Sequence, residues 1–234
     1  MASPPLCITC SKPGSVCASY HDAVYCGKDR QKADWQVHKL VCKSFAQLGE
    51  RPSPMHFRSI YFPPDHHKPV FRWLKVSLHV DEHEGPCHRP HLDFIHQDPW
   101  MVDLKNIQYD DVLKQNLSHT VCFASRDNFR NDGSMVNMSI NNATTWAALP
   151  NTYEWAGLVV AFGLKGVDTE APRMCDDLGT ADLRSLADYF YAYDEARTLA
   201  QRGSYKEVGR RLDVEKMMTR EQFAAMGFTN MSLG

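Results

Sequence analysis

The chain has 234 residues, of which 43% are hydrophobic and 23% are charged, and its formal net charge is −2 at pH 7. These fractions are ordinary for a globular protein and exclude wholesale disorder. The nearly balanced charge gives no support to nucleic-acid binding through a general electrostatic face. The longest apolar stretch, residues 155–164, is too short to span a bilayer.

The first segment of the chain is rich in cysteine and histidine at short spacings. It begins with a Cys-x2-Cys pair and ends with a His-x3-Cys pair. Six candidate ligands share this segment: Cys7, Cys10, Cys17, Cys26, His38 and Cys42. Thiolate and imidazole are the ligands that tetrahedral zinc prefers, and two of them on a tight turn can bind one ion. The spacing therefore predicts a zinc-binding segment.

The residues around these ligands resemble the second half of a MYND-type zinc finger. The resemblance rests on eight residues: Tyr25, Cys26, Gln31, Asp34, Trp35, His38, Lys39 and Cys42. That family normally offers eight ligands to two zinc ions in a cross-brace arrangement, and this sequence supplies six. Tyr20 and Arg30 stand where the family has its other two cysteines.

The resemblance implies two zinc sites that each lack one protein ligand. The cross-brace pairing gives them these ligands: Cys7, Cys10 and Cys26 for the first, and Cys17, His38 and Cys42 for the second. His21, one residue past Tyr20, can bring an imidazole to the second site. Asp29, beside Arg30, is a poorer substitute because carboxylate is unusual in a structural zinc site. We expect one zinc ion or two, with the second site better preserved.

A finger that no longer binds metal is the alternative. A segment of about 40 residues buries too little apolar surface to fold unaided, and structural zinc supplies about 10 kcal/mol or more to such units. Without zinc, the segment would depend on the rest of the protein.

The apolar pattern predicts further elements in chain order. Residues 31–47 show a helical stripe, and residues 51–54 form a linker. Strands are expected at five places: residues 59–62, 70–80, 101–107, 120–124 and 156–164. A polar, histidine-rich loop is expected over residues 81–90. Two helices with threonine caps are expected over residues 180–196 and 219–226.

The predicted fold class is α+β. A small N-terminal cross-brace zinc finger covers residues 1–48, and a mixed α+β domain with a mainly antiparallel sheet covers residues 49–234. The alternating and helical apolar positions predict one core in this domain. We expect that core to bury five side chains: Trp73, Leu158, Val160, Leu186 and Phe190.

The resemblance extends weakly past the finger. Four segments are similar to the tail of fungal proteins that carry an N-terminal MYND finger and are mostly of undefined activity: residues 58–63, 71–74, 155–160 and 183–190. The sequence lacks the motifs of the SET-domain lysine methyltransferases, the best-known enzymes with this finger. It has neither an Asn-His-Ser-type motif nor a trailing Cys-x-Cys-x2-Cys cluster.

A second group of metal-binding residue types lies outside the finger. Its members are His79, His83, Cys87, His88 and His91. Gly85-Pro86 would break a helix that could present two of the histidines on one face, which favours a solvated loop over a metal site. Cys122, near His119, lies in an apolar strand-like run, which favours a buried, inert thiol. No catalytic residue is predicted.

The resemblance also implies how a partner would bind. MYND fingers of the matching type bind proline-rich peptides, typically containing Pro-x-Leu-x-Pro, as an extended strand beside a groove. Gln31 and Trp35 match the positions that line this groove: the amide can bond a peptide backbone, and the indole offers a flat apolar face. The alternative role for Trp35 is packing inside the finger.

The function that follows is a zinc-binding adaptor or regulatory protein that recruits a protein partner through its finger. The alternative, from a different class, is an enzyme with its site in the second domain and the finger as a docking appendage. That alternative requires the histidines of residues 79–91 to converge on a pocket.

The compartment is inferred from the cysteines and the first residues. Residues 1–6 lack the basic start and apolar run of a secretory signal. Eight cysteines without such a signal favour reduced thiols and metal over disulfides. We expect the protein in the cytoplasm or the nucleus, with no membrane partner.

Overall fold

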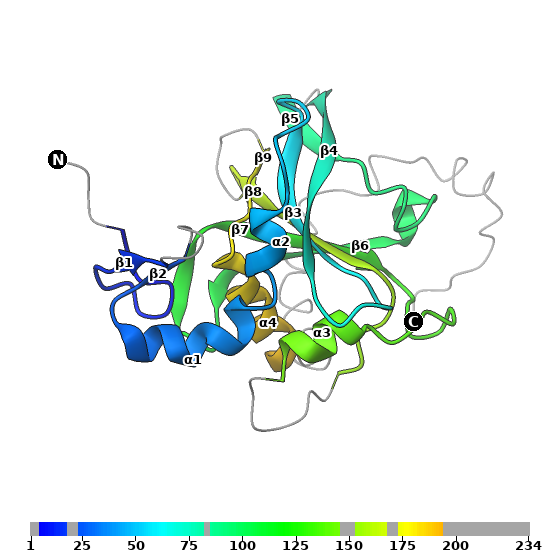
Figure 1. Ribbon diagram of the computed structural model, residues 1–234. Helices are drawn as coiled ribbons and strands as arrows, with labels where there is room; N and C mark the ends of the chain where they lie inside the picture. The colour runs from blue at the N-terminus through cyan, green and yellow to red at the C-terminus, as the bar shows by residue number, and fades with distance from the viewer. Residues whose placement is uncertain (1–4, 18–22, 82–84, 146–152, 168–172, 194–234) are drawn as a thin grey trace, which may run out of the picture. The chain divides into compact units, whose positions relative to one another are not determined.

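The computed structural model describes residues 5–17, 23–81, 85–145, 153–167 and 173–193 (Figure 1). The chain divides into two compact units, Met1–Ala192 and Tyr193–Gly234, and the elements described below belong to the first. The predicted helix over residues 219–226 lies outside the described residues, as do His21, His83 and the end of the predicted helix over residues 180–196. No helix in the described part of the chain is long and apolar enough to cross a membrane.

The N-terminal segment folds into a two-stranded sheet followed by two helices. Its elements are β1 (Ser15–Val16), β2 (Val24–Tyr25), α1 (Lys28–His38) and α2 (Cys42–Ala46). The prediction of one continuous helix over residues 31–47 was wrong, because the chain turns between α1 and α2. Leu40 and Val41, which lie in this turn, are both buried.

Seven strands form an antiparallel sheet in the described part of the chain. They are β3 (His56–Phe62), β4 (Val70–Asp81), β5 (Gly85–Pro90), β6 (Val102–Asp110), β7 (Gln115–Arg126), β8 (Val159–Lys165) and β9 (Met174–Asp176). The order across the sheet is β5-β4-β3-β8-β7-β6, and β9 pairs with the end of β8. The α+β class with a mainly antiparallel sheet is therefore confirmed.

The expected loop over residues 81–90 is instead largely a strand. β5 pairs with β4 in a hairpin whose register sets Cys87 opposite His79 and His88 opposite Leu78. Proline in this strand lies at the sheet edge, where a missing N–H breaks no ladder.

Both faces of the curled sheet are buried at its central strands, β7 and β8. Cys122 and Ala124 of β7 pack into one core with Val160 and Phe162 of β8. Phe123, between them, faces the opposite way. It lies edge-to-face with Phe190 of α4 (Asp182–Ala192), at 5.2 Å between ring centroids.

The remaining helices are short. They are η1 (Pro99–Met101) and α3 (Met138–Ala143). Of the five side chains expected in the core, Val160, Leu186 and Phe190 are fully buried, whereas Trp73 and Leu158 are half-buried. α4 lies beside α1, the helix of the N-terminal segment (Figure 1).

Candidate metal centre and partner groove

The Cys-x2-Cys pair lies on a tight turn. The N–H groups of Cys10 and Ser11 both donate to the carbonyl of Cys7, at 3.4 and 2.8 Å. Ser11 adopts φ of 54°, which closes the turn, and the Cys7 N–H bonds to the Lys12 carbonyl across it. The two thiols therefore project from the same short loop.

Close contact with the next strand requires glycine at position 14. A Cβ added to Gly14 would lie 2.6 Å from the carbonyl oxygen of Tyr25, closer than real Cβ contacts allow. This close approach brings the turn alongside β2 and Cys26, the residue after β2.

Three cysteine sulfur atoms meet beside this turn. Those of Cys7, Cys10 and Cys26 all lie within 4.8 Å of one another, and the Cys10 and Cys26 sulfurs are 3.5 Å apart. Two thiolates on one tetrahedral zinc, each about 2.3 Å from the ion, are separated by about 3.8 Å. The three thiols therefore fit a zinc ion in number, spacing and chemistry.

The surroundings of Cys7 favour its thiolate form. Burial alone would raise the pKa of Cys7, but hydrogen bonds from the Thr9 side chain and backbone outweigh it and lower the pKa to about 6. The Thr9 hydroxyl oxygen lies 3.3 Å from the sulfur. The hydrogen bond with Cys10 raises the pKa of Cys26 in turn. Since zinc binds the thiolate form, the lowered pKa of Cys7 favours metal binding at this residue.

The second ligand group is only partly assembled. His38 Nε2 lies 3.2 Å from the Cys42 sulfur, close to the roughly 3.5 Å that a nitrogen and a sulfur on one zinc would show. Cys17 does not join them within the same spacing, since the cysteines at 7, 10 and 26 are the one such ligand group among the described residues. The Gln31 amide lies 3.9 Å from the Cys17 sulfur instead.

The expected ranking of the two sites depends on His21 and stays a prediction, while the described residues bring the first ligand group together more closely than the second. The first group is compact, although Arg30 and Asp29 both lie exposed on α1 and do not complete it. The second has a buried His38–Cys42 pair and a separate Cys17, and His21 lies outside the described residues. The ranking predicted from the sequence depends mainly on His21, whereas the close approach of the Cys7, Cys10 and Cys26 thiols depends on Gly14.

A buried ionic network fixes the finger helix to α4. Tyr25 donates a hydrogen bond of 2.6 Å to Asp34 of α1, which is 2% exposed. Arg184 of α4 lies 3.7 Å from the other Asp34 oxygen and donates to Asp188 at 2.8 Å. Sequence reasoning noted Asp34 only as part of the MYND resemblance. Its burial beside an arginine 150 positions away had no local signal.

The cysteine turn is also tied to the sheet. The Gln115 side chain, at the start of β7, donates to the Ile8 carbonyl at 2.7 Å and accepts from the Ser11 hydroxyl at 3.1 Å. Both bonds reach the loop that carries Cys7 and Cys10. The candidate metal centre is thus supported from outside the finger.

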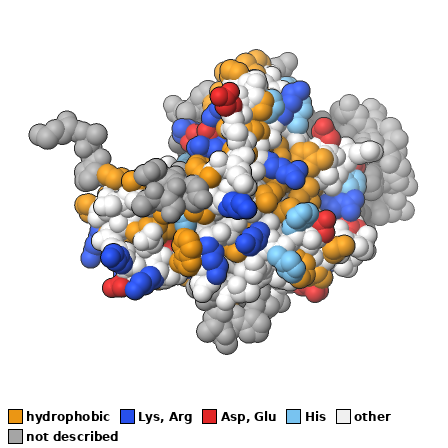
Figure 2. Space-filling model, in the orientation of Figure 1, with side chains coloured by type: hydrophobic (Ala, Val, Ile, Leu, Met, Phe, Trp, Pro, Cys, Tyr) orange, Lys and Arg blue, Asp and Glu red, His pale blue; other side chains and the backbone are white. Residues whose placement is uncertain are grey.

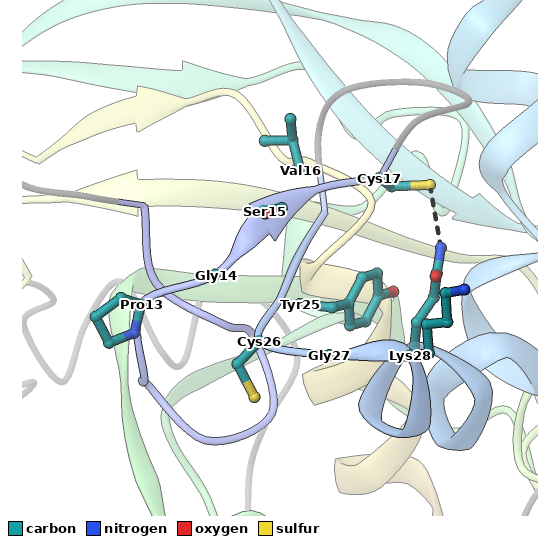
Figure 3. Close-up of a pocket in the computed structure, with 10 residues that line it drawn as sticks. Pro13, Gly14, Ser15, Val16, Cys17, Tyr25, Cys26, Gly27 and Lys28 are labelled. Atoms are coloured by element: carbon teal, nitrogen blue, oxygen red, sulfur yellow. Dashed lines mark hydrogen bonds between the residues drawn. The ribbon is translucent and has the colours of Figure 1, made fainter.

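Two surface cavities meet at Gln31. One, of about 300 Å³, is lined by Gln31, Lys32 and Trp35. The other, of about 520 Å³, runs from Gln31 along β1 and is drawn in Figure 3, where the Cys17 and Cys26 sulfur atoms point apart. Trp35 is 46% exposed, so it does not serve as a core residue of the finger. The two residues predicted to line a peptide groove therefore share a surface hollow.

The histidines of the β4–β5 hairpin do not gather into a metal site among the described residues. His88 Nδ1 accepts from the Cys175 N–H at 3.1 Å, and burial lowers the pKa of His88. No group of three ligand atoms forms among the described residues of this hairpin. Cys122 is buried, and burial raises its pKa to about 12, as expected for an inert thiol.

Comparison with known families places the N-terminal segment. Residues 7–42 match the family model described as MYND finger. The match begins at Cys7 and ends at Cys42, so it spans both ligand groups described above. Comparison with curated proteins and with solved structures finds no match for the chain.

The class that the site and this match define is the MYND-type zinc finger, a zinc-binding module for protein–protein interaction. The chain carries this finger at residues 7–42, followed by an α+β domain built on an antiparallel sheet.

Proposed function

We propose that the protein is an adaptor that uses its finger to recruit a partner carrying a proline-rich segment. The observation that carries this proposal is the exposure of Trp35 on a helix that the buried Asp34, the preceding residue, fixes in place. An exposed indole on a rigid support gives proline rings a flat apolar face to pack against at little cost in side-chain entropy.

Gln31 adds a polar contact beside that face. It lies one turn before Trp35 on α1 and lines both cavities, so its amide can bond a peptide backbone that runs beside the helix. The outer strand β1 borders the larger cavity through Ser15 and Val16. An extended peptide could therefore follow β1 and reach Trp35.

The zinc content is part of the same proposal. One ion binds Cys7, Cys10 and Cys26, and a second binds His38 and Cys42 together with Cys17 and His21. Both ions stabilise the support of α1, since Cys26 precedes the helix and His38 ends it.

A fluorescence polarisation titration tests the proposal. The zinc-loaded full chain is titrated into a fluorescein-labelled peptide with a Pro-x-Leu-x-Pro core and serine flanks. Trp35→Ala should weaken binding at least about tenfold, in line with loss of an aromatic hot spot. Trp100→Ala is the matched control, because Trp100 is 78% exposed but lies outside the finger. Equal affinity of wild type and Trp35→Ala would refute the groove.

A further inference from the structure

The outward face of the finger helix carries regularly spaced lysines. Lys28, Lys32 and Lys39 lie four and seven residues apart, and Trp35 falls between the last two. At about 100° per residue, these positions stay within about 60° of one another around the helix axis. Lys39 continues the helical backbone as the C-cap of α1, with φ of −58° and ψ of −21°. The lysines therefore flank the tryptophan along one stripe.

This stripe is exposed and is not neutralised by the surrounding described residues. All three lysines are exposed, and no ion pair within the described residues includes any of them. Figure 2 shows Lys and Arg side chains gathered over the finger, with few acidic ones among them. The nearest carboxylates in sequence are Asp29, which is one turn from Lys32 but in no ion pair with a described residue, and Asp34, which is buried.

The lysine stripe borders the two cavities of the candidate groove. Lys32 lines the same cavity as Trp35, and Lys28 lines the adjoining one. On the other side of the helix, Asp34 is held by Tyr25 and Arg184, so α1 cannot turn its lysines away without breaking that network.

We infer that the preferred partner segment carries acidic residues on both sides of its proline-rich core. This inference rests on the proposed function and adds the charge of the ligand to it. Lys28 and Lys39 are about 16 Å apart along α1, at about 1.5 Å per residue. An extended peptide covers that distance in about five residues. Acidic residues that bracket a five-residue core are about 20 Å apart in an extended chain, so they would lie just beyond the two ends of the stripe.

A comparison of three labelled peptides tests this inference. They share one Pro-x-Leu-x-Pro core and carry glutamate, serine or lysine flanks, and each is titrated with the zinc-loaded full chain. At about 50 mM salt, the glutamate peptide should bind about threefold to tenfold tighter than the serine peptide, the range expected for a few exposed ion pairs. The lysine peptide should bind more weakly. The differences should shrink at about 300 mM salt because exposed charges are then screened.

Charge-reversal variants test whether the lysines of the stripe are the source of the preference for acidic flanks. The variant Lys28→Glu/Lys32→Glu should reverse the order of the glutamate and lysine peptides. Lys68→Glu/Lys75→Glu makes the same change in net charge at exposed lysines outside the finger, and it should keep the wild-type order. Unchanged zinc content in both variants shows that the finger is intact.

The outcomes separate this inference from the proposed function. If the serine peptide binds through Trp35 but glutamate flanks add nothing, the charge inference fails and the groove stands. If no peptide binds, both fail. A labelled single-stranded DNA that binds more tightly than the glutamate peptide, and is lost in Lys28→Glu/Lys32→Glu, would assign the stripe to nucleic acid and overturn the inference.

Discussion

Arg184 on α4 lies 3.7 Å from Asp34 on α1, and both side chains are buried. One arginine thereby connects the finger helix to the last described helix of the sheet domain, because it also bonds Asp188 on its own helix. The support of the candidate groove depends on this contact as well as on metal.

Removal of Arg184 should destabilise the protein strongly. Arg184→Ala leaves the buried Asp34 and Asp188 without their cation, and breaking a buried pair in this way typically costs about 3–5 kcal/mol. Urea denaturation of the zinc-loaded protein measures the change. Lys165→Ala is the control, since the Lys165–Asp176 pair at 2.8 Å is largely exposed and should contribute about 0–1 kcal/mol. Equal losses in the two variants would contradict the role of Arg184.

Stability should fall as the pH rises from about 4 to about 7. Burial raises the pKa of Asp188 from its usual 3.8 to about 7, with Arg184 opposing and the Asp110 carboxyl adding to the rise. The folded state then holds a proton that the unfolded state releases at lower pH, so stability declines across this interval. Asp188→Asn cannot ionise, and it should flatten the decline. The measurement is urea denaturation at pH 5 and pH 8, and an equal decline in both proteins would exclude Asp188 as its source.

Gly14→Ala should disrupt the cysteine turn, whereas Gly27→Ala should not. The added methyl at position 14 would lie 2.6 Å from the Tyr25 carbonyl, but nothing lies within 4 Å of one at position 27. Gly27 has φ of 175°, an extended conformation that alanine also adopts. We expect Gly14→Ala to lose zinc to a weak chelator faster than wild type and Gly27→Ala to match wild type. Equal release rates would show that the turn tolerates the methyl group.

Zinc content should depend on both ligand groups. Cys26→Ser and Cys42→Ser should each remove about one zinc per chain, because each breaks a different site. His21→Ala should lower the zinc content more than Asp29→Asn, because imidazole is the better zinc ligand. Metal analysis of the purified variants by mass spectrometry measures these differences. An unchanged content in His21→Ala would exclude that imidazole as a ligand.

Much of the sheet was predictable because its strands are strongly apolar. Val121 to Ala124 form a continuous apolar run, and the structure buries all of it since the curled sheet has a core on each side. β5 was missed because its glycine, its two prolines and His88 are typical of a loop. Its strand state comes from pairing with β4, which lies outside any local pattern.

In the finger, too, some features could be predicted from the sequence and others could not. Ligand types and spacing identified the zinc-binding segment, since coordination chemistry restricts both. The relative completeness of the two groups was not predictable, because it depends on the close contact at Gly14 and on the Gln31 amide beside Cys17. Neither contact produces a spacing pattern that the sequence alone would reveal.

The contact between Asp34 and Arg184 has a consequence for synthesis of the chain on the ribosome. The arginine is 150 positions after the aspartate, and at about 5–20 residues per second it is made about 8–30 s later. Gln115, which bonds the turn of Cys7 and Cys10, also follows the complete finger. The nascent finger therefore lacks its contacts with Gln115 and Arg184 until those residues have been synthesised. Zinc can bind early, but the helix that bears Trp35 gains the support of Arg184 only after residue 184 has been made.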